Sequence, residues 1–192
     1  MKLAHGSLVI LLHAGLAFAN QAATPPSPVL SAPVASVSVG QVPPALELSD
    51  KRGGLVKGNL PWNSTELQQG AKVSILFYVA PSQKDLNEAI SDALKEAKFP
   101  EEKFQSIAVV NMAASSWPNF MIESKLKASQ EEFPRTRYIK DKEKVFVKEW
   151  QLEDDSSNVV LFDRKGVVLF VVKGKATPQQ VTELLTLIRT HL

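Results

Sequence analysis

The 192-residue sequence contains no cysteine. A chain without cysteine forms no disulfide bond, and it has no thiolate to attack a disulfide or a peroxide. It also lacks the ligands of Cys-coordinated zinc and of iron–sulfur clusters. This absence excludes whole classes of redox and metal chemistry before any fold is considered.

Histidine is almost as scarce, with only His5, His13 and His191 in the chain. The first two lie in an N-terminal segment that we expect to be removed, and His191 is the penultimate residue. A Ser-His-Asp triad needs an imidazole beside its nucleophile, and a multi-histidine metal site needs several imidazoles. The histidine content therefore argues against both kinds of site.

The N-terminus has the features of an export signal. Lys2 precedes an apolar stretch from Leu8 to Phe18, and the small-x-small pattern Ala17-Phe18-Ala19 follows. The apolar run is too short for a transmembrane helix, which needs about 20 residues. We predict a signal peptide over residues 1–19 with cleavage after Ala19, hence export to the periplasm of a Gram-negative cell. No later segment is predicted to span a membrane.

A segment rich in proline, alanine and serine follows over residues 20–38, and it contains the alternative cleavage sites Ala22 and Ala23. Such a sequence buries too little apolar surface to fold and is typical of a flexible linker. The remaining residues, 39–192, are numerous enough for one domain with a full core. The formal net charge is only +2, so we expect no nucleic-acid partner.

Hydrophobic periodicity predicts the elements of this domain. Alternating residues around Gly53-Gly54 indicate an N-terminal hairpin over 45–58. A strand–helix–strand order then indicates a parallel βαβ unit, and we expect Ser82 to cap its helix. Residues 141–149 fit either a strand or a short helix capped by Asp141, and we favour the helix. The other predicted elements are a helix up to Gln69, strands 72–79, 104–112 and 136–139, helix 119–132, hairpin 159–172, and a C-terminal helix opened by the capping box Thr177-Pro178-Gln179-Gln180.

This order predicts an α/β fold, a thioredoxin-like mixed sheet flanked by helices with an N-terminal β-hairpin extension. Three strings of the sequence also carry a resemblance: 150–160 (WQLEDDSSNVV), 109–111 (VVN) and 176–181 (ATPQQV). They resemble the YtfJ family of periplasmic thioredoxin-like proteins, over about residues 39–192. The resemblance implies export and a thioredoxin-like fold, and it implies no established reaction.

A thioredoxin-like fold implies a site where the first central strand meets its helix. The redox pair of such domains would occupy about Pro81 to Lys84, and the facing loop, here Asp154–Ser157, normally carries a cis-proline. This sequence has neither the thiols nor that proline. Free N–H groups at the helix start near Ser82 would suit an anion.

The acidic run Glu153, Asp154 and Asp155 has two interpretations. Adjacent carboxylates can bind a hard cation or form a general-acid pair. Alternatively they are a solvated turn, because consecutive residues of extended chain point to opposite faces. We favour the turn, so these three residues are only weak metal candidates. Ser156 and Ser157 fit the same turn, because no histidine is available to activate them.

Two other features have a functional and a structural interpretation. The tryptophans Trp62, Trp117 and Trp150 are either binding anchors or parts of the core, and we favour the core. The basic segment 135–148 is either a surface for anionic lipid or an acidic partner, or a solvated charged face, and we favour the charged face.

We therefore expect a non-catalytic binding or interaction module for an unknown periplasmic protein or peptide, with no cofactor. The alternative is an enzyme with non-thiol chemistry, or a cation or anion site, near Ser82 and Glu153–Ser157. The candidate binding surface consists of Ser82, Gln83, Trp150, Asp154, Asp155, Ser156 and Ser157.

Overall fold

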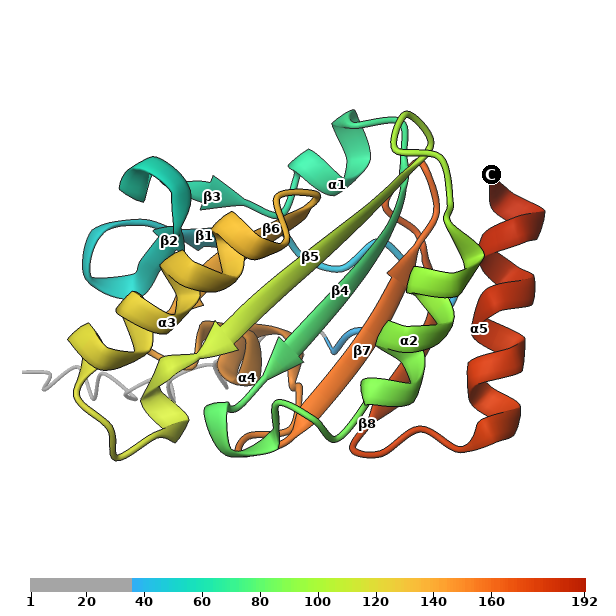
Figure 1. Ribbon diagram of the computed structural model, residues 1–192. Helices are drawn as coiled ribbons and strands as arrows, with labels where there is room; N and C mark the ends of the chain where they lie inside the picture. The colour runs from blue at the N-terminus through green and yellow to red at the C-terminus, as the bar shows by residue number, and fades with distance from the viewer. Residues whose placement is uncertain (1–35) are drawn as a thin grey trace, which may run out of the picture. The chain divides into compact units, whose positions relative to one another are not determined.

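A six-stranded mixed sheet forms the centre of the computed structural model, which describes residues 36–192 (Figure 1). The strand order is β2-β6-β5-β4-β7-β8. Strands β4, β5 and β6 run parallel to one another, whereas β2, β7 and β8 pair antiparallel with their neighbours. The sheet strands are β2 (Gly53–Leu55), β4 (Val73–Val79), β5 (Phe104–Asn111), β6 (Thr136–Asp141), β7 (Ser157–Phe162) and β8 (Val168–Lys173).

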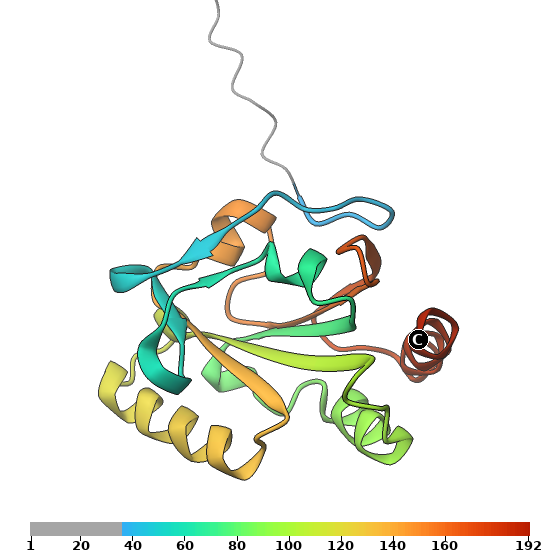
Figure 2. The same ribbon diagram turned by 90° about the horizontal axis from the view of Figure 1, so that it is seen from above.

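Helices cover both faces of this sheet (Figure 2). Helices α2 and α5 cover one face, where the core is packed around Ile75, Ile90 and Ile188. Helix α3 covers the β5–β6 side of the same face through Ile122 and Leu126. The α-helices are α1 (Glu66–Gln69), α2 (Glu88–Ala97), α3 (Asn119–Glu132), α4 (Val145–Trp150) and α5 (Pro178–His191), and the short 3-10 helices are η1 (Asp50–Arg52), η2 (Lys57–Asn59), η3 (Pro81–Gln83) and η4 (Met112–Ala114).

An aromatic core fills the opposite face of the sheet, beneath α1, α4 and the two-stranded sheet of β1 (Glu47–Leu48) and β3 (Trp62–Asn63). Phe146 lies at its centre, with its ring centroid 5.1 Å from that of Tyr78 and 4.9 Å from that of Trp150. Strand β4 contributes to both cores, since Ile75 faces α2 and α5 while Leu76 and Tyr78 face α4. Burial on both faces explains why the sequence of this strand is apolar almost throughout.

Most of the predicted central elements are confirmed. Strands β4 and β5 are parallel and joined by α2, and β7 and β8 form the predicted hairpin. Helix α3 has the predicted bounds. Helix α5 begins with the predicted capping box, in which the Thr177 side chain accepts from Gln180 N and the Gln180 side chain accepts from Thr177 N. The mixed, helix-flanked sheet of a thioredoxin-like fold is therefore present.

The helical interpretation of residues 141–149 is also confirmed. Helix α4 starts at Val145, and the buried carboxylate of Asp141 accepts hydrogen bonds from Val145 N (3.0 Å) and Phe146 N (3.1 Å). A side-chain oxygen that satisfies the first free N–H groups is what stabilises a helix start.

The N-terminal hairpin over 45–58 was predicted incorrectly. Strand β1 pairs instead with β3, Leu48 opposite Trp62, and β2 is an edge strand of the main sheet that pairs with β6. A Cβ on Gly53 would lie 1.9 Å from the carbonyl oxygen of Lys140, so glycine is required there by close packing of β2 on β6 rather than by a hairpin turn.

The helix start at Ser82 is a second correction. Ser82 lies in η3, and α2 begins only at Glu88, so Ser82 caps no α-helix. The anion site that depended on a helix start at Ser82 therefore has no basis.

The first described residues already contact the rest of the domain. Val37 is buried in the aromatic core and its N–H donates to the Trp150 carbonyl at 3.1 Å. The signal peptide, its cleavage sites and the linker up to residue 35 lie outside the described residues. Among residues 36–192, no helix is long and apolar enough to cross a membrane.

Candidate functional site

Segments far apart in the sequence meet at one edge of the sheet, where the parallel strands β4, β5 and β6 end and β7 begins (lower part of Figure 1). We call this the carboxyl edge. Ala80 N, directly after β4, donates to the carbonyl of Ser156 at 2.8 Å, so the turn after β4 lies against the loop before β7. This is the juxtaposition that the sequence analysis expected between Pro81–Lys84 and Asp154–Ser157.

A serine and an aspartate join the two segments at the surface. The Ser82 hydroxyl donates to Asp155 Oδ1 at 2.8 Å, and both side chains are exposed. Asp155 has a φ of 45°, a left-handed conformation that its short polar side chain tolerates. Gln83 is half-buried beside Ser82, and its N–H donates to the carbonyl of Ala80. Three predicted surface residues therefore do lie together.

Asp154 is held by two partners that the sequence did not indicate. Its Oδ1 accepts from Asn111 Nδ2 at 2.8 Å, and its Oδ2 accepts from Lys144 Nζ at 2.5 Å. The hydrogen bond from Lys144 holds the pKa of Asp154 below its ordinary value, and the bond from Asn111 acts in the same direction. Asp154 is thus an ionised, paired carboxylate rather than a general acid.

The three neighbouring carboxylates point to different partners. Glu153 Oε2 accepts from the Ser156 hydroxyl at 3.2 Å, while Asp154 binds Lys144 and Asp155 binds Ser82. Across residues 36–192, no group of three or more His, Cys, Asp or Glu side chains is arranged to hold a metal ion. The carboxylates of Glu153, Asp154 and Asp155 therefore do not converge on one point.

Ser157 lies inside the protein, below this surface. It is only 1 % exposed, and its hydroxyl accepts from Asn87 Nδ2 at 3.0 Å. The Asn87 amide also donates to the carbonyl of Gly174 and accepts from Ala176 N, so it ties β7 to the segment before α5. Ser157 is part of the scaffold that supports the edge and is not available to a partner.

Trp150 is also unavailable, which corrects its place in the predicted surface. Its side chain is completely buried, and its Nε1 donates to the carbonyl of Pro44 at 2.9 Å. Trp62 is buried in the same core. The core interpretation therefore holds for these two tryptophans, but Trp117 is 48 % exposed with the Lys125 ammonium 4.4 Å from its ring centroid.

The basic segment 135–148 is neutralised largely by ion pairs. Lys142 Nζ lies 2.8 Å from Glu123 Oε1, and the half-buried Arg137 lies 2.7 Å from Glu66 Oε2. Arg135 pairs with Glu101, and Lys144 with Asp154. These contacts support the structural interpretation of the segment.

A buried network that the sequence analysis missed supports the carboxyl edge from below. Tyr78 and Asp141 are fully buried, and the Tyr78 hydroxyl donates to Asp141 Oδ2 at 3.1 Å. Burial and the nearby carboxylate raise the pKa of Tyr78 far above its ordinary value, so its hydroxyl stays protonated. Asn111 is also fully buried, and its Oδ1 has no hydrogen-bond partner among the described residues.

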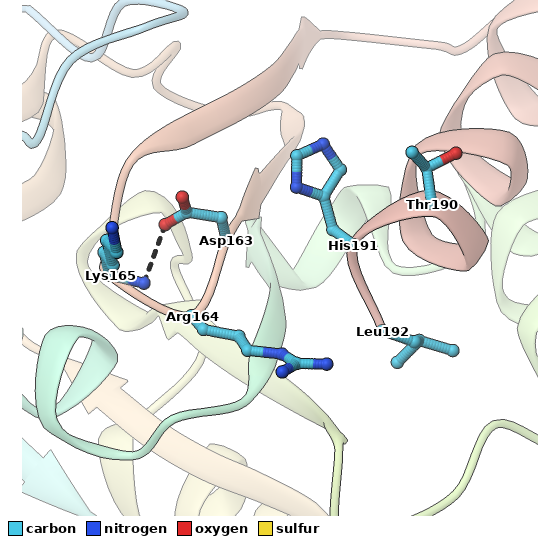
Figure 3. Close-up of a pocket in the computed structure, with 6 residues that line it drawn as sticks. All are labelled: Asp163, Arg164, Lys165, Thr190, His191 and Leu192. Atoms are coloured by element: carbon cyan, nitrogen blue, oxygen red, sulfur yellow. Dashed lines mark hydrogen bonds between the residues drawn. The ribbon is translucent and has the colours of Figure 1, made fainter.

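The pocket drawn in Figure 3 lies at the opposite edge of the sheet. It has a volume of about 390 Å³ between the β7–β8 turn at Asp163–Lys165 and the end of α5 at Thr190–Leu192. The Asp163 carboxylate there accepts from Lys165 N and stabilises the turn. The pocket shares no residue with the carboxyl edge.

The fold of the described residues is thioredoxin-like. A thiol:disulfide interchange protein of the DsbE type from Chlorobium tepidum superposes with a TM-score of 0.57 at 18% identity, covering 81% of this chain and 99% of the other. The exposed lipoprotein thioredoxin Etrx1 from Streptococcus pneumoniae gives a TM-score of 0.55 at 12% identity, covering 77% and 99%. At these identities the likeness shows the fold alone.

Sequence comparison identifies the family to which the chain belongs. A family model described as "Bacterial protein of unknown function (YtfJ_HI0045)" matches residues 30–191, so the chain belongs to the YtfJ family. The "Uncharacterized protein YtfJ" of Escherichia coli is 31% identical over 161 residues, which are 80% of this chain and 86% of the relative. An "Uncharacterized protein" of Haemophilus influenzae is 24% identical over 131 residues, covering 67% and 70%. The resemblance found in the sequence is confirmed.

Proposed function

We propose that this protein is exported to the periplasm and works there as a non-catalytic module that binds a protein or peptide at the carboxyl edge. The observation that carries the proposal is the contact between Ser82 and Asp155. Both side chains are exposed, Ser82 follows β4 at the position where a thioredoxin-like plan implies the redox thiols, and the chain has no cysteine. Thiol–disulfide exchange and peroxide reduction require a thiolate, so binding is what this surface can still provide.

The available groups at the edge suit a polar segment of polypeptide. The carboxylates of Glu153 and Asp155 accept only from the hydroxyls of Ser156 and Ser82, and neither takes part in a salt bridge within residues 36–192. Each carboxylate oxygen accepts more than one hydrogen bond, so both retain capacity for backbone N–H groups or a basic side chain. The proposed surface consists of Ser82, Gln83, Glu153, Asp155, Ser156 and the paired Asp154.

Export rests on the N-terminal sequence. Lys2, the apolar run and Ala17-Phe18-Ala19 favour cleavage after Ala19. Mass spectrometry of the chain recovered from a periplasmic fraction tests this directly. The expected N-terminus is Asn20, and an uncleaved chain retained in the cytoplasm would contradict export.

Binding is tested by capture from periplasmic extract with the immobilised mature chain. We expect one specific partner to be retained by the wild type and lost with Asp155→Lys, which reverses an exposed charge at the edge. Asp92→Lys on the exposed side of α2 makes the same charge change elsewhere and should retain the partner. Equal retention by both variants, or turnover of insulin disulfides by the purified protein, would contradict the proposal.

A further inference from the structure

A groove of about 970 Å³ lies apart from the carboxyl edge, between the β2–η2 segment, the C-terminal half of α3 and the start of β6. In Figure 2 these three segments lie at the left, with η2 beside β6 and α3 beneath. The volume is in the range of small-molecule sites, about 300–1,000 Å³. None of the residues that line it belongs to the surface proposed above.

The groove has an apolar floor. Leu55, Val56, Leu60 and Pro134 line it, and Val56 continues into the core beneath α3 through its cluster with Leu126. Leu60 is 59 % exposed, although a leucine of this size gains from burial. A ligand that covers Leu60 would therefore remove an exposed apolar side chain from water.

The rim carries positive charge that the protein neutralises only in part. Lys57 in η2 and Lys127 in α3 both line the groove, and neither forms a salt bridge within the described part of the chain, although the charge of Lys127 also acts on Glu123. Arg137 also lines it but is bound to Glu66. Glu131 supplies a negative charge at the same rim, so the groove suits a ligand with a single compact anionic group rather than a polyanion.

Other occupants fit the lining less well. A peptide that adds a strand needs free N–H groups on the edge strand β2, but Leu55 N already donates to the carbonyl of Leu60 at 2.9 Å. The Gln130 amide is held by the protein, since it donates to Thr136 O and accepts from Tyr138 N. Among residues 36–192, no aromatic side chain lines the groove to stack on a nucleobase.

We propose that this groove binds a long-chain carboxylate, with the alkyl chain along Leu55, Val56 and Leu60 and the carboxylate between the ammonium groups of Lys57 and Lys127. The flexible lysine stems can adjust to the head group and cover part of the chain. The site is independent of the partner surface at the carboxyl edge.

Calorimetric titration of the mature chain with dodecanoate below its micellar concentration tests this site. We expect saturable binding at one site, weakened about tenfold by Lys57→Glu/Lys127→Glu and to a similar degree by Leu60→Asp, whose exposed position tolerates the change. Lys95→Glu/Lys175→Glu makes the same charge change at exposed positions outside the groove and should leave the affinity within about twofold. Butanoate, which lacks the chain, should not bind.

Three results would overturn the proposal. The first is that dodecanoate gives no saturable heat. The second is that both groove variants keep the wild-type affinity, and the third is that the Lys95→Glu/Lys175→Glu control loses as much affinity as they do. Each variant is first checked for wild-type thermal unfolding, so that lost binding is not mistaken for lost structure.

Discussion

Replacing Asp141 with alanine tests how the carboxyl edge is held in place. The Asp141 carboxylate accepts from the Tyr78 hydroxyl (3.1 Å), Glu143 N (3.1 Å), Val145 N (3.0 Å) and Phe146 N (3.1 Å). Hydrogen bonds to a charged group contribute about 1.5–3 kcal/mol each when measured by removal. Glu143 is an exposed residue, but the Tyr78 hydroxyl and the N–H groups of Val145 and Phe146 would lose a partner inside the protein. We therefore expect Asp141→Ala to lower the free energy of unfolding by about 3–5 kcal/mol.

Urea unfolding followed by tryptophan fluorescence measures this change. Tyr78→Phe removes only one of the four donors and should cost about 1 kcal/mol. Asp92→Ala, an exposed aspartate on α2, serves as the control and should stay within about 0.5 kcal/mol of the wild type. A loss below about 1 kcal/mol for Asp141→Ala would refute the view that this carboxylate organises β6, α4 and β4 together.

Three further predictions follow from burial, backbone geometry and charge. Trp150→Ala should lower the free energy of unfolding by about 3–5 kcal/mol in urea, since the indole is fully buried; a change below about 1 kcal/mol would contradict its place in the core. Gly53→Ala should cost at least about 2 kcal/mol and increase amide exchange in β2, because its Cβ would overlap the Lys140 carbonyl. Lys144→Met should raise the pKa of Asp154 measured by NMR, and an unchanged pKa would show that the pair does not form in solution. Because the pKa of Asp154 is lowered in the folded state, the pair stabilises the protein at pH values above the ordinary carboxyl pKa. This stabilisation is lost as the pH falls through the lowered pKa. The pair is exposed, so it contributes less than about 1 kcal/mol.

Elements whose signals are local in the sequence were predictable. Helix α3 and the βαβ unit follow from periodicity, and the start of α5 follows from Thr177 and Gln180 three residues apart. The start of α4 was predictable because Asp141 lies only four residues before Val145. In each case the residue that determines the element lies within one or two helical turns of it.

Elements that depend on distant partners were not predictable. Gly53-Gly54 has the composition of a hairpin turn, but Gly53 is needed because the backbone of β6 approaches closely, and Gly54 because the carbonyl of Leu60 does. Ser82 has the spacing of a capping residue, yet its hydroxyl donates to Asp155, 73 residues away. A single sequence does not show whether such a residue forms a local turn or cap or instead contacts a distant segment.

The candidate surface was predicted in part for the same reason. The segments that contain Ser82 and Asp155 were expected together because the thioredoxin-like plan brings them to one edge, and they are in contact there. Trp150 was included as a possible binding anchor and Ser157 as part of the loop that faces Pro81–Lys84, but both side chains are buried. Lys144 and Asn111 were missed because only the folded chain brings them to Asp154.

In-cell photo-crosslinking is the most direct test of binding at the carboxyl edge. A photoreactive amino acid is placed at Ser82, or as a control at Lys165, which is exposed in the β7–β8 turn at the opposite edge of the sheet. We predict a discrete crosslinked product in the periplasm from position 82, absent from position 165 and lost when Asp155→Lys is added. The same products from both positions, or none from position 82, would contradict a partner surface at this edge.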